Sequence, residues 1–488
     1  MEHVAIDIGA SGGTVLAGSV TDDELRIETV HRFDNQPVQL RDRYVWDIDA
    51  LVSSIQTGLS EAAAKGGAFD TVGVDTWAVD FGLYDADGLI RDPYAYRDPA
   101  VAETLDDILD VVSKREIFEA TGINHWNVPN TLWQYHALAR TEPDVLAETE
   151  TILMIPQVLS AALGGDRCAE ETVASTTQLF DPRPRTWADS LFEALELPMD
   201  PLPEIRETGS TIGTLDSEAV ADFESPPEIV LPASHDTAAA VAALPLSDGK
   251  RTFLSTGSWF IAGVELDEPV LTDEAFAFGA SNELGVADTV RFLKNVNGFF
   301  LLEECRKRWR EEGGLYEYDT LVSAAREADR GGPLVDPDDD RLTIEGPMPE
   351  NVATFCRETG QDVPNEEGAI ARSLFESLAV KTAMTVERIE SIAGLEGDVL
   401  SVGGGGVRND LFLEMLASAL DRPVRTGPVE ATAVGNIVTQ GVARGEIDDI
   451  QHGRDIVRTS VDSREYEPTD VAYFERRREA FETVLEAA

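Results

Sequence analysis

A histidine, an aspartate and a threonine stand side by side where an alanine-rich apolar stretch begins, in LPASHDTAAAVAALP over residues 231–245. The pattern predicts a helix that starts near His235 and Asp236. One interpretation is structural, with Ser234 or Asp236 capping the helix, because an acid is favourable at this end. The other is chemical, because a carboxylate beside a phosphate-binding cleft can accept a proton from an alcohol. A serine–histidine–aspartate triad is disfavoured, since Ser234 is adjacent to His235 and would not face it.

The segment DIGASGG near the start of the chain has the composition of a phosphate-binding corner. Asp7 stands at the end of an alternating strand pattern, and Gly9, Ser11, Gly12 and Gly13 follow it. Glycines at a tight turn leave backbone N–H groups open to phosphate oxygens. A carboxylate beside such a turn can hold Mg²⁺, usually through its waters. A plain glycine hairpin, with Asp7 paired to a neighbour, is the structural alternative.

Two later segments could complete a nucleotide site. In LSTGSW a second corner carries the hydroxyls of Ser255, Thr256 and Ser258, although an ordinary hairpin turn has the same composition. In SVGGGGVRND, the four glycines at 403–406 are costly to order, which favours close approach to a flat ligand such as adenosine. Neither a GxxxxGK[ST] loop nor a well-placed GxGxxG motif is present. Together, the two corners could hold a polyphosphate from opposite sides of a cleft.

The elements that must position these residues form two similar halves. HVAIDIGASGGTVLAGSV alternates, with Val4, Ile6 and Ile8 on one face, and predicts a strand, a glycine corner and an antiparallel strand. RTFLSTGSWFIAGVEL, which begins at residue 251, repeats that pattern. Helical and strand patterns mix throughout, so each half is predicted to be α/β. We expect domains at 1–245 and 246–488, a surface loop at 331–350, and a terminal helix at 469–487 that packs back on the first domain.

The composition limits the class of protein. There are 91 acidic and 39 basic residues, a net charge of −52, and the acid excess runs along the whole chain of 488 residues. This predicts adaptation to a salt-rich cytoplasm, as in a halophile, because concentrated salt screens the repulsion. Such a surface would repel nucleic acid. The three widely spaced cysteines indicate neither disulfides nor zinc, and no apolar run could span a membrane. We expect a cytoplasmic monomer or homodimer.

Taken in order, these segments resemble the FGGY carbohydrate kinases. The resemblance rests on Asp7-Ile8-Gly9, Ser255–Trp259, the glycines at 403–406 and GPVEATAVGN at 427–436. Within the family it is strongest to the members that act on L-rhamnulose, through DTWAVDF (75–81), YRD (96–98), SHDTA (234–238) and LKNVNG (293–298). It implies two ribonuclease H-like domains, of the actin and hexokinase ATPase type, flanking a central cleft. It also implies transfer of a phosphoryl group from ATP to the primary hydroxyl of a ketose.

The resemblance also implies roles for individual residues. Asp236 would be the general base, and the sugar would be contacted by Trp77, Ala78, His235, Asp236 and Thr237. Asp7 would lie near Mg²⁺. The nucleotide and its phosphates would be held by Ser11, Gly12, Gly13, Thr14, Ser258, Asn295, Glu303, Gly404 and Gly405. Under this interpretation the base role of Asp236 is favoured over a purely structural one.

Four positions depart from the pattern of the family members that act on L-rhamnulose. Gly12 and Thr14 stand where a serine and an arginine are usual, Ala78 replaces a glycine, and Glu303 replaces a glutamine. L-Rhamnulose is therefore the first candidate substrate, with L-fuculose, L-xylulose and glycerol as alternatives. Two other classes also remain: a catalytically silent sugar-sensing protein on the kinase fold, and an actin-like or chaperone-like ATPase without a sugar site.

Overall fold

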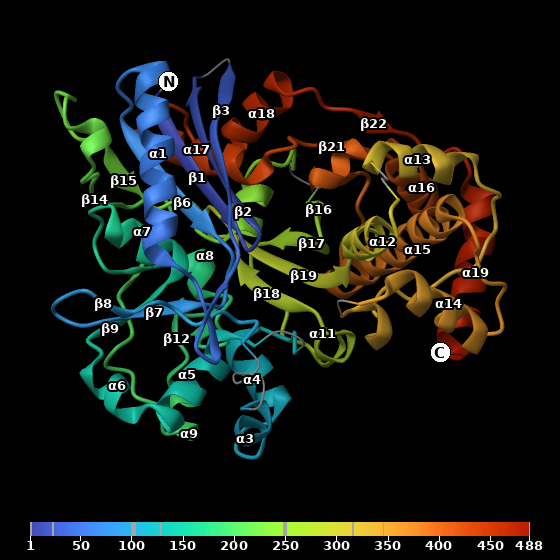
Figure 1. Cartoon of the computed structure of the whole chain (residues 1–488), viewed down its shortest axis with the longest axis horizontal. Coiled ribbons are helices and arrows are strands. Elements are labelled where there is room, and N and C mark those ends of the chain that lie inside the picture. The colour runs from blue at the N-terminus through green and yellow to red at the C-terminus, as the bar shows by residue number, and fades with distance from the viewer. Residues whose placement is uncertain are drawn as a thin grey trace. The chain divides into compact units, whose positions relative to one another are not determined.

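The structure, a computed structural model, describes residues 2–21, 24–98, 104–126, 129–246, 251–314, 317–344 and 346–487. The chain folds into two compact units (Figure 1). Unit 1 contains Met1–Pro245, Glu265–Phe292 and Glu430–Val461, and unit 2 contains Leu246–Val264, Leu293–Val429 and Asp462–Ala488. Strands β17 (Trp259–Leu266) and β19 (Val290–Asn297) carry the chain from one unit to the other. Both units combine helices with sheets, so the predicted α/β class is confirmed.

The main sheet of unit 1 has six strands in the order β14-β15-β6-β1-β2-β3. They are β1 (His3–Gly9), β2 (Gly12–Val20), β3 (Leu25–Asp34), β6 (Thr71–Thr76), β14 (Thr211–Thr214) and β15 (Glu228–Val230). Strands β1, β2 and β3 form the antiparallel meander that the sequence predicts, whereas β6 pairs in parallel with β1. Because the β1–β6 register sets Asp7 beside Asp75, the topology alone brings two acidic residues together.

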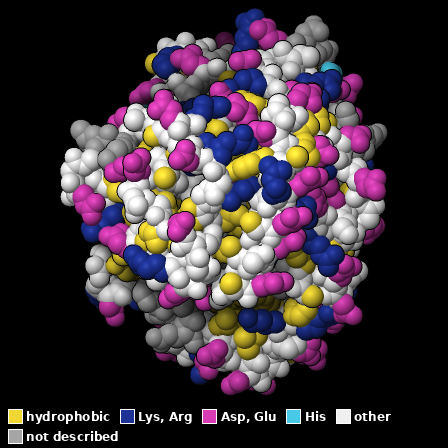
Figure 2. Space-filling model, turned by 90° about the vertical axis from the view of Figure 1, so that its right-hand side faces the viewer, with side chains coloured by type: hydrophobic (Ala, Val, Ile, Leu, Met, Phe, Trp, Pro, Cys, Tyr) yellow, Lys and Arg dark blue, Asp and Glu magenta, His cyan; other side chains and the backbone are white. Residues whose placement is uncertain are grey.

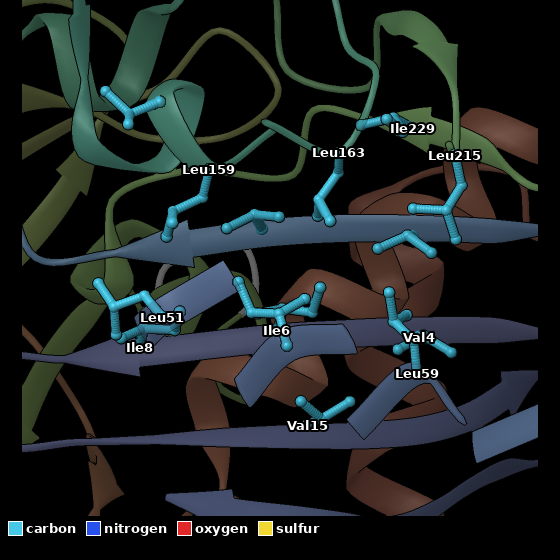
Figure 3. Packing of buried hydrophobic residues seen from close by; sticks show 14 of the residues in the cluster. Val4, Ile6, Ile8, Val15, Leu51, Leu59, Leu159, Leu163, Leu215 and Ile229 are labelled. Carbon is cyan, nitrogen blue, oxygen red and sulfur yellow. The ribbon is translucent and has the colours of Figure 1, made fainter. Parts of the chain in front are cut away.

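One face of this sheet is covered by helices α1 (Ile48–Gly66) and α7 (Ile155–Ala162) (Figure 1). Figure 3 shows the apolar core between them, to which β1 contributes Val4, Ile6 and Ile8, all fully buried. Other members of this core are Val15 from β2, Leu51 and Leu59 from α1, Leu159 from α7, and Leu163, Leu215 and Ile229. The alternation of apolar residues along β1 therefore predicts the covered face.

Helices α10 (Asp236–Ala242) and α17 (Ala431–Arg444) cover the opposite face. The two helices pack very closely, because a Cβ at Gly435 would lie only 1.8 Å from the carbonyl oxygen of Ala239. Ala5 and Leu16 point from the sheet into this second core, and α18 (Ile450–Ser460) packs on α17. The helix that begins at Asp236 is thus held by close backbone contact as well as by apolar burial.

A second layer of unit 1 is built on the three-stranded sheet β8-β7-β9. Strands β7 (Phe81–Tyr84) and β8 (Leu89–Arg91) form a hairpin, and Asp85 N–H donates to the Gly88 carbonyl in its turn. The helices around it are α3 (Leu105–Leu109), α4 (Lys114–Thr121), α5 (Thr131–Thr141), α6 (Pro143–Glu148), α8 (Glu171–Ala174) and α9 (Asp189–Ala194). Their apolar side chains form a core of their own, which includes Tyr135, Phe180 and Phe192.

The second large sheet has the order β18-β19-β17-β16-β20-β21-β22. Its further strands are β16 (Thr252–Thr256), β18 (Ser281–Leu284), β20 (Leu400–Gly404), β21 (Val424–Thr426) and β22 (Glu465–Tyr466). Strands β16 and β17 form the predicted antiparallel hairpin, and β20 runs parallel to β16. The helices of unit 2 are α12 (Phe300–Glu311), α13 (Tyr318–Glu327), α14 (Met348–Glu358), α15 (Glu367–Ala393), α16 (Asp410–Leu420) and α19 (Val471–Ala487).

The remaining elements are short. They are β4 (Val38–Leu40), β5 (Arg43–Val45), β9 (Thr151–Met154), β10 (Ala169–Glu170), β11 (Phe180–Asp181), β12 (Thr186–Trp187), β13 (Ile205–Arg206) and α11 (Asp273–Phe278). Three 3₁₀ turns cover Glu218–Val220, Asp340–Leu342 and Gly405–Arg408. Among the described residues, no helix is both long and apolar enough to cross a membrane.

Two expectations about unit 2 are wrong. The terminal helix α19 packs on α15 and α16 of its own unit, because Arg477 pairs with the buried Glu376 of α15 and Phe481 is fully buried. The segment 331–350 is not a surface loop throughout, because Val335 and Leu342 are fully buried. Its many Asp, Gly and Pro residues correctly predict turns but do not reveal the buried apolar residues between them.

The contact between α10 and α17 generates the first prediction. Replacing Gly435 with alanine should lower the free energy of unfolding by about 3 kcal/mol, because the new methyl group forces the two helices apart. Chemical unfolding in molar KCl measures the change. Gly332→Ala is the matched control: no heavy atom lies within 4 Å of its Cβ position, so its effect should stay within about 0.5 kcal/mol. Equal stability of the two variants would contradict the close packing.

Candidate active site

The first glycine corner lies between β1 and β2 and contains Ser11 at its exposed tip. Asn35 fixes it by donating from its side-chain amide to the Gly9 carbonyl at 2.8 Å. Gly13 has an internal reason to be glycine, since a Cβ there would overlap the ring of Phe33. Thr14 is nearly buried, and its hydroxyl oxygen accepts a hydrogen bond from Arg32 Nη1 at 3.2 Å. The exposed part of the corner is therefore the turn at Ser11, while Gly13 and Thr14 belong to strand β2.

Two carboxylates meet beside this corner. Asp75 is fully buried, and its Oδ2 accepts a hydrogen bond from Asn436 Nδ2 at 2.6 Å, whereas no described residue donates to its Oδ1. Burial, and then the negative charges of Asp236 and Glu430, raise the pKa of Asp7 to about 7. Burial and the neighbouring Asp7 raise the pKa of Asp75 well above its ordinary range. Such a pair is stabilised by a shared proton or by a bound cation.

These residues fit a magnesium ion. Mg²⁺ is a hard cation that prefers carboxylate and water oxygens and usually takes one or two carboxylates from the protein. The pair supplies that donor set, and the buried Oδ1 of Asp75 lacks a donor among the described residues. Sequence analysis singled out Asp7 but assigned no role to Asp75. The available signal was its place in DTWAVDF, on the strand that pairs with β1.

The segment with His235, Asp236 and Thr237 runs beside the end of β6, where Thr76 N–H donates to the Ser234 carbonyl at 3.0 Å. Asp236 is the first residue of α10 and is partly exposed. Its Oδ1 accepts from Thr237 N–H at 2.6 Å and from the Thr237 hydroxyl at 3.2 Å, so its hydrogen bonds within the described residues leave Oδ2 open. Asp236 also raises the pKa of Asp7, so the three carboxylates share one region.

Neither Ser234 nor Asp236 is the N-cap residue of α10. His235 occupies that position, and its own side chain makes no capping hydrogen bond. Ser234 is fully buried and its hydroxyl donates to the Pro232 carbonyl instead. Asp236 follows the N-cap, and its Oδ1 accepts from Thr237 N–H in the first turn of the helix.

A buried charged network supports His235 from behind. The guanidinium of Arg291 is fully buried, with Nη2 lying 3.2 Å from His235 Nδ1 and 3.0 Å from Glu283 Oε2. Glu283 Oε2 also lies 3.4 Å from Nδ1 of His235, but the guanidinium is closer and can only donate, so Nδ1 accepts and Nε2 carries the proton. That nitrogen lies 3.3 Å from Asp236 Oδ1. The network thus fixes the tautomer of His235 and turns its N–H toward Asp236.

The negative partner in this network is Glu283. Burial alone would raise the pKa of Glu283, but the positive charge of the adjacent Arg291 is the strongest opposing influence, and the pKa falls to about 2. Glu170, also fully buried, accepts from Ser234 N–H at 3.1 Å and from Thr208 Oγ1 at 2.6 Å. Glu170, Glu283 and Arg291 were missed by sequence reasoning, because no motif surrounds them.

The predicted sugar-contact stretch is held by Asp80, which is almost fully buried. Asp80 accepts hydrogen bonds from the indole nitrogens of Trp46 at 2.7 Å and Trp77 at 3.0 Å, and from Gln134 Nε2 at 2.8 Å. Burial raises the pKa of Asp80 to about 6, although these hydrogen bonds oppose the rise. The ring centroids of Trp46 and Trp77 lie 4.3 Å apart, so Trp77 is packed rigidly and is nearly buried.

One strained backbone position lies in the same stretch. Val79 has φ of +73°, which is unfavourable for a β-branched residue. Its carbonyl accepts hydrogen bonds from Thr131 Oγ1 at 2.8 Å and Gln134 Nε2 at 3.1 Å, which hold the strained conformation. The neighbouring Ala78 is partly exposed. Strain at a pre-formed binding loop is typical of functional sites.

In unit 2, the glycine run packs against the second corner. The Thr256 hydroxyl donates to the Gly403 carbonyl at 2.6 Å and accepts from Gly406 N–H at 3.0 Å. A Cβ at Gly404 or Gly406 would collide with Thr256, and Gly404 also has φ of +83°. Gly405 is exposed, and no heavy atom lies within 4 Å of its Cβ position. Internal packing thus explains two of the four glycines, and only Gly405 presents an open backbone.

Three further predicted residues lie in unit 2. Ser258 is exposed at the turn between β16 and β17, and its carbonyl accepts from Gly298 N–H at 2.9 Å. Asn295 is partly buried on β19. Glu303 is exposed on α12 and pairs with Arg306 at 2.5 Å, so its negative charge is locally offset. That these residues form one site with those of unit 1 stays a prediction.

An α/β protein with a carboxylate cluster beside an open glycine corner has the character of an ATP-dependent phosphotransferase. Residues 3–243 match the N-terminal domain of the FGGY family of carbohydrate kinases, and residues 252–444 match its C-terminal domain. The chain belongs to the FGGY family of carbohydrate kinases.

Relatives and solved structures agree with this family. The chain is 37% identical to a rhamnulokinase from Bacteroides thetaiotaomicron over 96% of each chain. It is 35% identical to a rhamnulokinase from Halalkalibacterium halodurans, over 96% of this chain and 99% of that protein. A ligand-bound xylulose kinase from Lactobacillus acidophilus superposes with a TM-score of 0.79 at 14% identity, covering 99% of this chain and 98% of that one. A Plasmodium falciparum glycerol kinase with ADP superposes with a TM-score of 0.77 at 16% identity, covering 100% of this chain and 98% of that one. The predicted pair of ribonuclease H-like domains is confirmed.

The buried Asp80 generates a prediction about pH. Its pKa is about 6 in the folded protein and 3.8 ordinarily, so the folded state holds an extra proton between these values. Its contribution to the free energy of unfolding therefore falls by about 3 kcal/mol as pH rises from 3.8 to 6, and is constant above. Asp80→Asn cannot ionise and should lack this fall. Denaturant unfolding of both proteins at several pH values measures the difference.

The matched control for this prediction is Asp87→Asn, at an exposed turn in the same unit. Its pH profile should run parallel to that of the wild type. A profile of Asp80→Asn that also ran parallel to the wild type would show that the pKa of Asp80 is the same in the folded and unfolded protein.

Proposed function

We propose that this kinase transfers the γ-phosphoryl group of ATP to the primary hydroxyl of L-rhamnulose, giving L-rhamnulose 1-phosphate. The observation that carries the proposal is the carboxylate cluster of Asp7, Asp75 and Asp236 in unit 1, in which Asp236 keeps Oδ2 open. The substrate is supported by curated relatives at 33–37% identity that carry the name rhamnulokinase. L-Fuculose and L-xylulose are the alternative acceptors.

Asp236 is the general base of this proposal. Thr237 holds Oδ1 through two hydrogen bonds, which leaves Oδ2 to accept the proton of the sugar hydroxyl. The resulting alkoxide-like oxygen attacks the γ-phosphorus in line, and the bond to the β-phosphate oxygen breaks. His235, oriented by Arg291, presents its Nε2–H beside this carboxylate, where a bound sugar oxygen would also accept from it.

The remaining site residues keep the roles that the family resemblance gives them. Trp77, Ala78, His235 and Thr237 contact the sugar, and the rigid packing of Trp77 against Trp46 supports a pre-formed wall. Asp7 and Asp75 would hold Mg²⁺, which offsets the negative charge of the transferred group. Ser11, Gly12, Gly13, Thr14, Ser258, Asn295, Glu303, Gly404 and Gly405 bind ATP in this proposal.

The decisive test is ADP release in molar KCl with Mg·ATP and a panel of ketoses. The wild type should turn over L-rhamnulose, and Asp236→Asn should lower kcat by about 10²- to 10⁴-fold, because the proton acceptor is lost. The control is Asp273→Asn, which removes an acid that is exposed and paired with Arg115; its kcat should be unchanged.

Other outcomes separate the alternatives. Turnover of a different ketose would support the mechanism and replace L-rhamnulose as the substrate. Sugar binding without turnover indicates a silent sensor, and ATP hydrolysis that needs no sugar indicates an ATPase. An unchanged kcat in Asp236→Asn would remove the base role.

We further propose that the protein works in a salt-rich cytoplasm. The net charge of −52 and the presence of only six lysines support this. Figure 2 shows acidic side chains spread over the whole face in view. At 1 M salt the screening length is about 3 Å, so repulsion between neighbouring exposed carboxylates is largely removed.

Screening gives a direct prediction for stability. The melting temperature should rise steeply between dilute buffer and molar KCl, because salt removes self-repulsion in the folded state. Calorimetry measures it, with sucrose at matched osmolality as the uncharged control. A melting temperature that responds equally to KCl and sucrose, or to neither, would contradict the charge argument.

A further inference from the structure

A continuous chain of buried polar side chains crosses unit 1, between strands β1 and β6 and helix α17. His3 Nδ1 lies 2.7 Å from Thr71 Oγ1, which lies 2.5 Å from Gln440 Oε1. Gln440 Nε2 lies 2.6 Å from Asn436 Oδ1, and Asn436 Nδ2 lies 2.6 Å from Asp75 Oδ2. All five residues are fully buried. The chain ends at the carboxylate that adjoins Asp7.

The direction of these hydrogen bonds is fixed by two backbone carbonyls. Asn436 Nδ2 also reaches the Gly73 carbonyl at 3.2 Å, and Gln440 Nε2 also reaches the Val4 carbonyl at 3.1 Å. Carbonyl oxygens only accept, so each of these atoms is an amide nitrogen and neither amide can be reversed. Gln440 therefore donates to Asn436, and Asn436 donates to Asp75.

The same reasoning extends outward to the histidine. Gln440 Oε1 only accepts, so Thr71 gives its single hydroxyl proton to it. Thr71 Oγ1 must then accept from His3, so Nδ1 of His3 carries a proton. Nε2 of His3 contacts Glu446 Oε2 at 2.8 Å, which requires a further proton between these two groups. Every donor in the chain points toward Asp75.

The backbone leaves room for this arrangement at one position. A Cβ at Gly73 would lie 2.4 Å from Asn436 Oδ1 and 2.9 Å from Gln440 Nε2. Any side chain at residue 73 would therefore displace both amides. The hydrogen-bonded pair Asn436 and Gln440 occupies the space that a side chain at residue 73 would fill. The packing of β6 against α17 is therefore fitted to this chain of hydrogen bonds.

We propose that His3, Thr71 and Gln440 are positioning residues for the phosphate side of the active site. They hold the Asn436 amide so that it donates to Asp75 Oδ2, which turns Asp75 Oδ1 toward Asp7. Thr71 lies four residues before Asp75 on β6, roughly 13 Å away along the strand. It acts through its neighbours and touches neither substrate. The kinetic consequence rests on the proposed function.

The test compares Thr71→Val, which removes the hydroxyl at constant size, with Thr71→Ser, which keeps it. Thr71→Val should lower kcat at least tenfold while the KM for the sugar changes less than twofold. Thr71→Ser should stay within twofold of the wild type in both constants. If Thr71→Val does not fold, Gln440→Met breaks the same chain from the helix side. A folded Thr71→Val or Gln440→Met with the wild-type kcat overturns the proposal.

An NMR experiment tests the direction of these hydrogen bonds independently of enzyme activity. Ring ¹⁵N and ¹H signals of His3, assigned with His3→Gln, should show a protonated Nδ1 in the wild type and in Thr71→Ser. Asp75→Asn, at the other end, should shift these signals, and the shift should vanish in Thr71→Val/Asp75→Asn. An unprotonated Nδ1, or no response to Asp75→Asn, overturns the proposed chain.

The two arms also separate this proposal from the proposed function. If the wild type phosphorylates no ketose, the proposed function fails, and the ring signals still decide whether the chain runs as described. If the wild type is active and the ring signals follow the chain, but Thr71→Val keeps full kcat, the positioning role alone fails.

Discussion

Carboxylates that share a poorly solvated space repel one another, and unit 1 is arranged so that three of them meet. Asp7 and Asp75 come from the paired strands β1 and β6, and Asp236 comes from the start of α10. The described hydrogen bond to Asp75 comes from the neutral amide of Asn436, so the protein does not cancel the charge itself. The cluster keeps its capacity for a cation, which is what transfer of a phosphoryl group requires.

A site with this much repulsion needs a stiff surround. The segment before α10 is held at its backbone by Glu170, and its histidine is held by the Arg291–Glu283 pair. Separating the partners of a buried ion pair leaves an uncompensated buried charge, which strongly destabilises the fold, so these groups have a single stable arrangement. The close contact of Gly435 with Ala239 fixes the helix itself. These contacts thereby fix the geometry around Asp236.

The parts of the fold that could be predicted are those encoded locally. The strand–corner–strand patterns and the motifs around Asp7 and Asp236 are contiguous in sequence, and the structure reproduces these elements. Glu170, Glu283 and Arg291 are ordinary residues from distant segments, and only the topology brings them to His235. The same holds for α17 and α18, which lie in unit 1 although they follow most of unit 2 in the chain.

Local patterns are ambiguous where two causes give one composition. Consecutive glycines suggest a ligand, yet Gly404 and Gly406 are explained by contact with Thr256, and Gly13 by contact with Phe33. The acid after a helix start suggests a cap, yet His235 occupies the N-cap position and Asp236 accepts from Thr237 N–H one residue later. In each case the distinguishing fact is a three-dimensional neighbour, which a single sequence does not contain.

The departures from the family pattern can be understood in the same way. An arginine is usual where this chain has Thr14, and its loss would remove a positive charge from the phosphate corner. The β2–β3 register sets Arg32 beside Thr14, and Arg32 Nη1 donates to the Thr14 hydroxyl. The side chain of Arg32 is more than half exposed and is steadied by Glu430, 2.8 Å away. The corner therefore keeps a guanidinium on the adjacent strand, so residue 14 can be a threonine without leaving an entirely acidic site.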